Sequence, residues 1–217
     1  MIDISTDTRR KLRDLLEARA FRTGEITLST GAKSNFYFDC KSVTLSADGA
    51  YLVGMAFLDA LEKLPDRPGA VGGLTHGADP IVSSMVALSY ARECPIGGFY
   101  VRKEPKRHGT QRRLENPPQP GTKVLIVDDV VTSGGSLLKA VEEARAADCE
   151  VVAAMALVDR GEQDGAANIR KEVGTYVPLY TRSDFPRIGG GSGRARTPIA
   201  SGEPAARESS TLTPSGA

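Results

Sequence analysis

The segment from Val124 to Ser136, with the sequence VLIVDDVVTSGGS, constrains the fold more than any other part of the chain. It starts with four apolar residues, a run typical of a strand that is buried on both faces. The adjacent carboxylates Asp128 and Asp129 follow, and a loop rich in hydroxyl groups and glycines then leads into a predicted helix. In open α/β sheets, such strand–loop–helix turns bind ligands at the carboxyl ends of the strands.

The alternation of strands and helices extends along most of the chain. The predicted elements are helix 7–20, strands 25–28 and 36–39, helix 47–64, strand 70–74, helix 80–91, strand 96–101, strand 124–127, helix 136–147 and strand 151–158. We therefore predict an α/β fold with an open, mostly parallel sheet that is flanked by helices.

Composition argues against several classes of protein. A formal net charge of +1 over 217 residues gives no electrostatic sign of nucleic-acid binding. No apolar run approaches the ~20 residues that cross a bilayer, and the N-terminus lacks the pattern of a signal peptide. The three cysteines form no CxxC pair or Cys/His cluster, which favours buried thiols in a reducing compartment. We expect a cytoplasmic protein without nucleic-acid or membrane partners.

The composition changes after Ile188. Residues 189–217 are rich in Gly, Ser, Thr, Pro and Ala and contain almost no large apolar side chains. Burial cannot offset the ordering entropy of such a segment, so we predict a single domain over residues 1–188 and a disordered low-complexity tail over 189–217.

The loop from Thr132 to Ser136 has the composition of an anion-binding site. Glycines let a backbone approach a phosphate, while loop N–H groups and a helix N-terminus favour negative charge. The Gly-Lys-Ser/Thr step of a P-loop is missing. Carboxylates beside an anion site suit a sugar phosphate, with the acids on its hydroxyl groups. The alternative is an acidic turn that precedes an ordinary helix cap.

The same segment closely resembles the signature with which type I phosphoribosyltransferases bind phosphoribosyl pyrophosphate (PRPP). The resemblance implies the fold of that family, with Asp128 and Asp129 on the ribose hydroxyls and the following loop on the 5-phosphate. The implied PRPP-binding residues of this segment are Asp128, Asp129, Val130, Val131, Thr132, Ser133, Gly134, Gly135 and Ser136.

Two further segments resemble the orotate branch of the family. Residues 28–39, LSTGAKSNFYFD, are similar to a segment that folds over the base in those enzymes. This implies a small N-terminal hood, approximately residues 1–45 with a C-terminal part, and an orotate pocket lined by Tyr37 and Phe38. Aromatic side chains that pack a small core are the alternative. Residues 72–80, GGLTHGADP, are similar to the loop that approaches the pyrophosphate.

A basic segment, residues 101–110 with the sequence VRKEPKRHGT, resembles the mobile catalytic loop of the orotate enzymes. The resemblance implies that Lys106 and Lys103 act in catalysis together with the two aspartates, and that Arg102, Lys103, Lys106 and His108 bind the pyrophosphate. Cations aimed at the charge that develops on a leaving group lower the barrier. A surface run of charge is the alternative.

Arg160 follows the last predicted strand, where the orotate enzymes carry an arginine that binds the orotate carboxylate. A planar guanidinium suits that task, and Thr132 is implied as a second orotate contact. An ordinary surface ion pair is the alternative for Arg160. The chain departs from the family at Ser29, where many members have lysine, at Gly161, and at Asn116, where the usual glycine of the loop hinge is missing.

The resemblance runs from about residue 10 to residue 185. It implies transfer of the ribose 5-phosphate of PRPP to N1 of orotate, which gives orotidine 5′-monophosphate and pyrophosphate in de novo pyrimidine biosynthesis. It also implies Mg²⁺ that enters with PRPP and has no direct protein ligand, and a homodimer whose subunits share the catalytic loop. The alternatives are a phosphoribosyltransferase for a purine or another base, and a PRPP-sensing regulatory protein without turnover.

Overall fold

The computed structural model describes residues 6–27, 33–104 and 113–185, and only the backbone of residues 22–27 and 33–37. Three groups of predictions therefore lie outside the described residues. They concern the roles of Lys106 and His108, the side chain of Tyr37, and the disorder of the tail.

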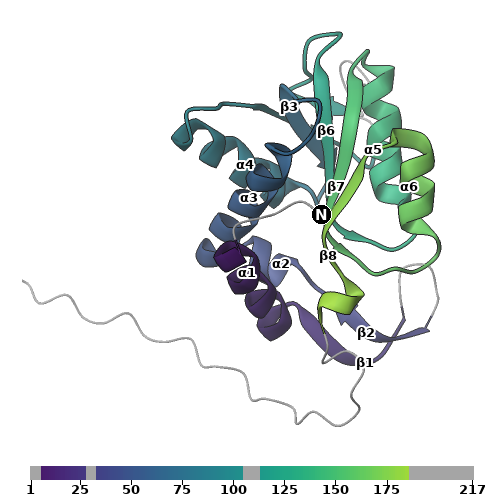
Figure 1. The fold of residues 1–217 in the computed structure, drawn as a ribbon. Coiled ribbons are helices and arrows are strands. Elements are labelled where there is room, and N and C mark those ends of the chain that lie inside the picture. Colours follow the sequence, from purple (N-terminus) through teal and green to yellow (C-terminus); the bar gives the residue numbers. More distant parts are fainter. Residues whose placement is uncertain (1–5, 28–32, 105–112, 186–217) are drawn as a thin grey trace, which may run out of the picture.

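A six-stranded sheet forms the centre of the described structure (Figure 1). The strand order is β5-β4-β3-β6-β7-β8, and every neighbouring pair is parallel except β4 and β5. The strands are β3 (Ala70–Leu74), β4 (Gly97–Val101), β5 (Leu114–Glu115), β6 (Lys123–Val131), β7 (Glu150–Asp159) and β8 (Tyr176–Thr181). The predicted open, mostly parallel sheet is confirmed.

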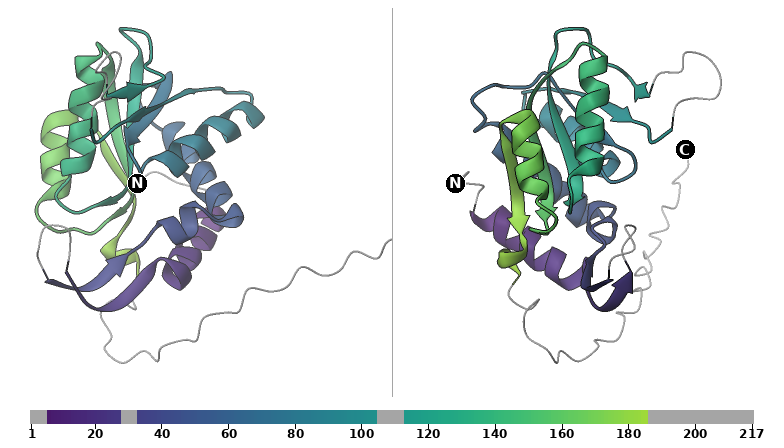
Figure 2. Two further views of the ribbon diagram at one scale, coloured as in Figure 1. Left: turned by 180° about the vertical axis from the view of Figure 1, so that it is seen from behind. Right: turned by 90° about the vertical axis from the view of Figure 1, so that its right-hand side faces the viewer.

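Helices cover both faces of the sheet (Figures 1 and 2). One face carries α3 (Ala47–Leu61) and α4 (Asp79–Ala91), and the other carries α5 (Gly135–Ala146) and α6 (Gly165–Val173). Along β6, Leu125 and Val127 pack into the core beneath α3 and α4, whereas Val124 and Ile126 pack beneath α5 and α6. This alternation explains why the run is apolar at every position.

The hood consists of α1 (Thr6–Arg19), the antiparallel pair β1 (Phe21–Thr27) and β2 (Lys33–Phe38), and the short helix α2 (Lys41–Thr44). In Figure 1 it lies below the sheet, at the end where the parallel strands finish. The Phe38 ring is 3% exposed, and its centroid lies 5.1 Å from that of Phe185. Phe185 follows the 3₁₀ helix η1 (Arg182–Asp184) after β8, so the aromatic contact ties the hood to the edge of the sheet.

The prediction missed two C-terminal elements, α6 and β8. Helix α6 is only nine residues long and buries only Gly165 and Ile169, so few large apolar side chains mark it in the sequence. Strand β8 contains Pro178, which argues against a central strand but is tolerated at the edge, where β8 lies. Strand β6 also extends beyond its predicted end at Val127, because its ladder with β7 continues to the pair Val131–Asp159.

The sheet has a topological switch point between β3 and β6. The chain leaves β3 toward β4 on one side and leaves β6 toward β7 on the other. The ladder between β3 and β6 ends at Gly72 and Ile126, so the two strands separate beyond these residues. In open α/β sheets such a separation forms the crevice in which ligands bind.

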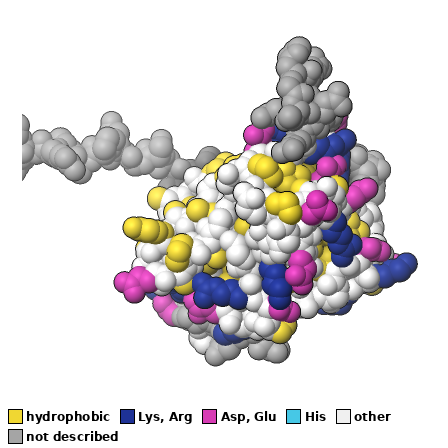
Figure 3. All heavy atoms as spheres, turned by 90° about the horizontal axis from the view of Figure 1, so that it is seen from above, with side chains coloured by type: hydrophobic (Ala, Val, Ile, Leu, Met, Phe, Trp, Pro, Cys, Tyr) yellow, Lys and Arg dark blue, Asp and Glu magenta, His cyan; other side chains and the backbone are white. Residues whose placement is uncertain are grey.

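The surface carries charges of both signs. On the side seen from above in Figure 3, which is opposite the hood, Lys and Arg side chains lie next to Asp and Glu side chains. Among the residues whose side chains are described, the exposed large hydrophobic ones are Leu45, Tyr51 and Tyr90. Among the helices of the described residues, none combines the length and hydropathy that a membrane span needs.

The aromatic contact between hood and sheet is testable by substitution. Phe185 is 1% exposed and packs against Phe38 and Tyr180. We expect Phe185→Ala to lower the free energy of unfolding by about 3–5 kcal/mol, because the change leaves a cavity between two rings. The measurement is urea unfolding followed by circular dichroism. The exposed Tyr90 provides the control, with an expected change for Tyr90→Ala within about 0.5 kcal/mol. Equal unfolding midpoints would contradict the assignment.

Candidate active site

Two adjacent carboxylates lie at the crevice between β3 and β6. Asp128 is 5% exposed, and its Oδ1 accepts a hydrogen bond of 3.0 Å from the backbone N–H of Asp129. Asp129 Oδ1 accepts a bond of 2.9 Å from the N–H of Val130. The Lys41 Nζ lies 3.7 Å from the other oxygen of Asp129. The backbone and one cation thus hold the pair of acids, and each carboxylate keeps lone pairs for further donors.

Glycines bring the loop after β3 onto these carboxylates. A Cβ atom on Gly77 would lie 2.5 Å from Asp129 Oδ1 and 2.7 Å from Asp128 Oδ1. A Cβ atom on Gly73 would lie 2.1 Å from the carbonyl oxygen of Val127. Only glycine permits such approaches, so Gly73 and Gly77 have a structural reason at the crevice itself.

Burial and charge act together on Asp128. Burial raises the pKa of its carboxyl group well above the usual value, and the neighbouring negative charge of Asp129 raises that pKa further. The cation of Lys41 acts in the opposite direction. A buried carboxyl group of this kind gains from a hydroxyl group that donates to it, since the hydroxyl replaces part of the lost hydration.

The loop between β6 and α5 exposes backbone N–H groups beside the acids. Gly134 adopts φ +83°, a left-handed conformation that favours glycine, and it starts α5. The N-cap residue Gly134 has no side chain to cap the helix, and the Ser133 hydroxyl accepts only a long hydrogen bond of 3.4 Å from the Gly135 N–H. Asn168 of α6 donates to the carbonyl oxygen of Ser133 at 3.4 Å and supports the loop from behind. A helix N-terminus of this kind is suited to bind a phosphate.

A cavity of about 230 Å³ joins these parts. Its lining combines the predicted residues Lys103, Asp128, Asp129, Val130 and Ser136 with Lys41, Leu74, Thr75, His76 and Gly77. The structure therefore brings one cation of the basic segment to the two acids and to the first turn of α5. Lys41 was not predicted, because a single lysine in a short helix has no motif, and only the fold brings it to Asp129.

Arg102 and Arg160 do not line this cavity. The Arg102 guanidinium donates from Nε to Glu115 of β5. The Arg160 side chain is 2% exposed, and its Nη2 lies 3.2 Å from the Glu162 carboxylate. A side chain with so little exposure does not form an ordinary surface ion pair, which was the alternative for Arg160. Asp159 shapes the turn, since its carboxylate accepts from the Tyr176 hydroxyl and from the Gly161 N–H.

Phe38 lies in the core of the hood and not in the cavity. Its ring packs 5.6 Å from Phe21 and 5.1 Å from Phe185, between centroids. The alternative of aromatic packing thus describes its contacts in this structure. A contact between Phe38 and orotate stays a prediction, as does one from Thr132, which is half-buried in the loop before α5.

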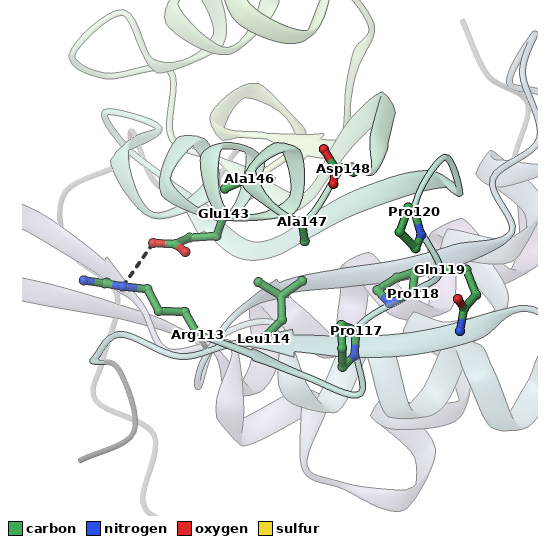
Figure 4. A pocket seen from close by; sticks show the side chains of 10 residues that line it. All are labelled: Arg113, Leu114, Pro117, Pro118, Gln119, Pro120, Glu143, Ala146, Ala147 and Asp148. Atoms are coloured by element: carbon green, nitrogen blue, oxygen red, sulfur yellow. Dashed lines mark ion pairs between the residues drawn. The ribbon is translucent and has the colours of Figure 1, made fainter. Parts of the chain in front are cut away.

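A larger cavity of about 490 Å³ lies away from the acids, between residues 113–120 and the last turns of α5 (Figure 4). Pro117, Pro118 and Pro120 form one wall, and Ala146 and Ala147 form the other. It contains neither of the two acids nor any residue of the loop 132–136. The larger cavity therefore lacks the acidic residues, whereas the smaller cavity contains both of them. These carboxylates identify the smaller cavity as the candidate active site.

Comparison with known proteins defines the class of the protein. Residues 71–176, from β3 to the start of β8, match the family described as "Phosphoribosyl transferase domain". The orotate phosphoribosyltransferase of Rhodopirellula baltica is 48% identical over 150 residues, which cover 67% of this chain and 78% of that protein. The chain belongs to the orotate phosphoribosyltransferase family.

Solved structures agree with this assignment. The orotate phosphoribosyltransferase of Mycobacterium tuberculosis H37Rv has a TM-score of 0.71 and is 33% identical, with 82% of this chain and 98% of that chain covered. The same protein in complex with PRPP has a TM-score of 0.67 and 27% identity, with 84% and 93% covered.

The raised pKa of Asp128 predicts a pH-dependent cost of folding. The native state binds the proton more tightly than the unfolded chain does, so the cost is absent below the unfolded pKa near 3.8 and grows as the pH rises from there. We expect Asp128→Asn to raise the Tm of the ligand-free protein at neutral pH, and the gain to vanish at about pH 4.

The measurement is calorimetry of both proteins over a pH series. Glu142→Gln, which removes an exposed carboxylate of α5, is the control and should leave the Tm unchanged. A Tm difference for Asp128→Asn that is equal at all pH values would show that the carboxyl group is not destabilised by burial.

Proposed function

We propose that this protein transfers the ribose 5-phosphate of PRPP to N1 of orotate and releases orotidine 5′-monophosphate and pyrophosphate, in de novo pyrimidine (UMP) biosynthesis. The observation that carries the proposal is the pair of the buried Asp128 and the half-buried Asp129 beside the N-terminus of α5, in a chain of the orotate phosphoribosyltransferase family. The similar protein from Mycobacterium tuberculosis has been solved in complex with PRPP.

The acids and the loop divide the recognition of PRPP between them. Asp128 and Asp129 accept hydrogen bonds from the ribose hydroxyls, and the N–H groups of residues 132–136 hold the 5-phosphate. Asp129 and the start of α5 are close to one another along the chain. A single ribose 5-phosphate can therefore contact the acid through its hydroxyl groups and the helix through its phosphate. This anchoring fixes the anomeric carbon and supplies much of the rate by orientation.

Cations that line the same cavity stabilise the leaving group. Lys103 lines the cavity, and Lys41 lies beside Asp129. As the bond from the anomeric carbon to pyrophosphate breaks, negative charge accumulates on the pyrophosphate, and fixed cations lower the barrier. Lys106 and His108 of the same basic segment join Lys103 when the segment closes over the site and excludes water.

Magnesium fits this cavity as part of the PRPP complex. Among the described residues, no group of three or more His, Cys, Asp or Glu side chains is placed to bind a metal ion. One oxygen of Asp128 and one of Asp129 already accept backbone hydrogen bonds. Mg²⁺ retains waters and takes phosphate oxygens readily, and it neutralises charge on the pyrophosphate. We propose that the ion would enter with PRPP, held by phosphate and ribose oxygens and by water and not by a direct protein ligand.

Arg160 selects the base. It follows β7, at the same end of the sheet as the acids, and its backbone N–H donates to Val131 of β6 at 3.0 Å. A guanidinium fork binds a carboxylate with two parallel hydrogen bonds, and orotate carries a carboxylate that purines lack. Glu162 holds the guanidinium until orotate binds.

We infer in addition a cytoplasmic homodimer. Leu45 and Tyr51, which are exposed near the start of α3, provide apolar area for a second subunit. The free cysteines Cys40, Cys94 and Cys149 fit a reducing compartment. Light scattering of the purified protein tests the assembly, and the mass of a monomer would contradict it.

Activity is tested directly by incubating the protein with PRPP, Mg²⁺ and orotate while the ultraviolet absorbance of orotate is followed. Adenine, hypoxanthine and uracil serve as parallel substrates. We expect turnover with orotate alone. Turnover with a purine instead would keep the PRPP site and overturn the role of Arg160. Saturable PRPP binding without turnover of any base would favour a regulatory protein.

Arg160 is tested by the conservative change Arg160→Lys, which keeps the charge but loses the fork. We expect the KM for orotate to rise about tenfold or more, because the variant loses one strong charged hydrogen bond. The Kd for PRPP should be unchanged. Steady-state kinetics and calorimetric titration measure the two values. Arg170→Lys on the exposed side of α6 is the control. An unchanged KM for orotate would remove Arg160 from the binding site.

A further inference from the structure

The two ends of the basic segment lie side by side. The backbone N–H of Arg102 donates to the carbonyl oxygen of Arg113 at 2.8 Å. The Arg102 side chain pairs with Glu115, two residues beyond Arg113. Residues 102–104 and 113–115 thus form a stem, and the position of Lys103 depends on what holds this stem.

The carbonyl oxygen of Lys103 accepts hydrogen bonds from two cations. Arg113 Nη1 donates at 2.9 Å, and Lys139 Nζ donates at 3.0 Å. Hydrogen bonds from charged donors are roughly twice as strong as those from neutral donors. The backbone of Lys103 is therefore fixed, although its side chain is exposed toward the cavity.

Both cations are anchored through α5. Lys139 belongs to this helix, and Arg113 Nε lies 3.1 Å from Glu143 of the same helix. Figure 4 shows the Arg113 guanidinium and the Glu143 carboxylate facing one another at one end of the larger cavity. Lys139 and Glu143 are four residues apart and so lie on one face of α5. The two residues contact the stem at successive turns of the helix.

The N-terminus of α5 begins in the loop that we assign to the 5-phosphate. Ser136 of its first turn lines the same cavity as Lys103. One rigid helix therefore contacts both the phosphate end of the site and the stem that carries Lys103. The separation of these two parts is fixed by the helix and not by the flexible side chains.

We propose that Arg113, Lys139 and Glu143 are positioning residues, which hold the Lys103 backbone against α5 and so preorganise the Lys103 side chain for the pyrophosphate of PRPP. The proposal rests on the proposed function, because Lys103 is assigned there to the leaving group. A cation that is fixed before substrate arrives needs no reorganisation during the reaction.

The test compares Arg113→Met and Lys139→Met, which keep most of the aliphatic stem and remove the donors. We expect each variant to raise the KM for PRPP about tenfold, which corresponds to the loss of one charged hydrogen bond in the bound state. The KM for orotate should be unchanged. Arg113→Lys keeps the charge but cannot donate to the Lys103 carbonyl and pair with Glu143 at the same time. Its KM for PRPP should therefore lie between that of the wild-type protein and that of Arg113→Met.

Arg145→Met is the matched control. Arg145 is also a cation of α5 that donates to a backbone carbonyl, that of Glu172 at 2.7 Å, but this contact leads to α6 and not to the stem. Its loss should lower the Tm as much as the loss of Lys139 does and leave the KM for PRPP unchanged. If all three methionine variants change only the Tm, the contacts are structural and the proposal is wrong.

The wild-type protein separates this proposal from the proposed function. If it turns over orotate with PRPP and the Arg113 and Lys139 variants keep its KM for PRPP, only the positioning role is overturned. If it does not turn over orotate, calorimetric titration with PRPP and Mg²⁺ still compares the variants. A weaker Kd in Arg113→Met and Lys139→Met than in Arg145→Met would then support positioning, and equal Kd values would contradict it.

Discussion

The burial of Asp128 beside Asp129 is the constraint on which the rest of the site depends. Two like charges in a nearly dry crevice repel one another and lose hydration. The fold accommodates them because β3 and β6 separate beyond Gly72 and Ile126, which leaves room, and because backbone N–H groups bond to both acids. Gly77 closes over the pair, where a larger residue would collide with the carboxylates. A ligand with several hydroxyl groups supplies the donors that water would otherwise provide.

Helix α5 relates the parts of the site to one another. Its first residues form the end that we propose for the phosphate, and Gly134 gives the sharp turn that precedes them. Its next two turns carry Lys139 and Glu143, which contact the stem of the basic segment directly or through Arg113. The helix also packs its apolar side on β6 through Leu137 and Val141. Core packing therefore sets the distance between the phosphate end and the stem.

The hood contributes through its attachment and not only through its own residues. Phe38 ends β2 and is locked against Phe185, while the Tyr180 hydroxyl donates to the Arg9 carbonyl at 2.7 Å. These contacts bind the N-terminal part to the last strand of the sheet. Lys41 follows Phe38 after only a short turn, so the same packing brings its ammonium group to Asp129. An aromatic core thus determines the position of a charge in the site.

The sequence by itself determined the α/β class and most of the strands and helices, and it pointed to the acids and loop of the candidate site, because local periodicity and contiguous motifs carry this information. The missed β8 is interrupted by Pro178, and the missed α6 is only nine residues long. Only the tertiary structure decided that Lys41 faces Asp129, that Phe38 packs in a core, and that two cations hold the Lys103 carbonyl. Each of these contacts joins segments that are distant along the chain, and their pairing follows from strand order and helix packing, which no local pattern encodes.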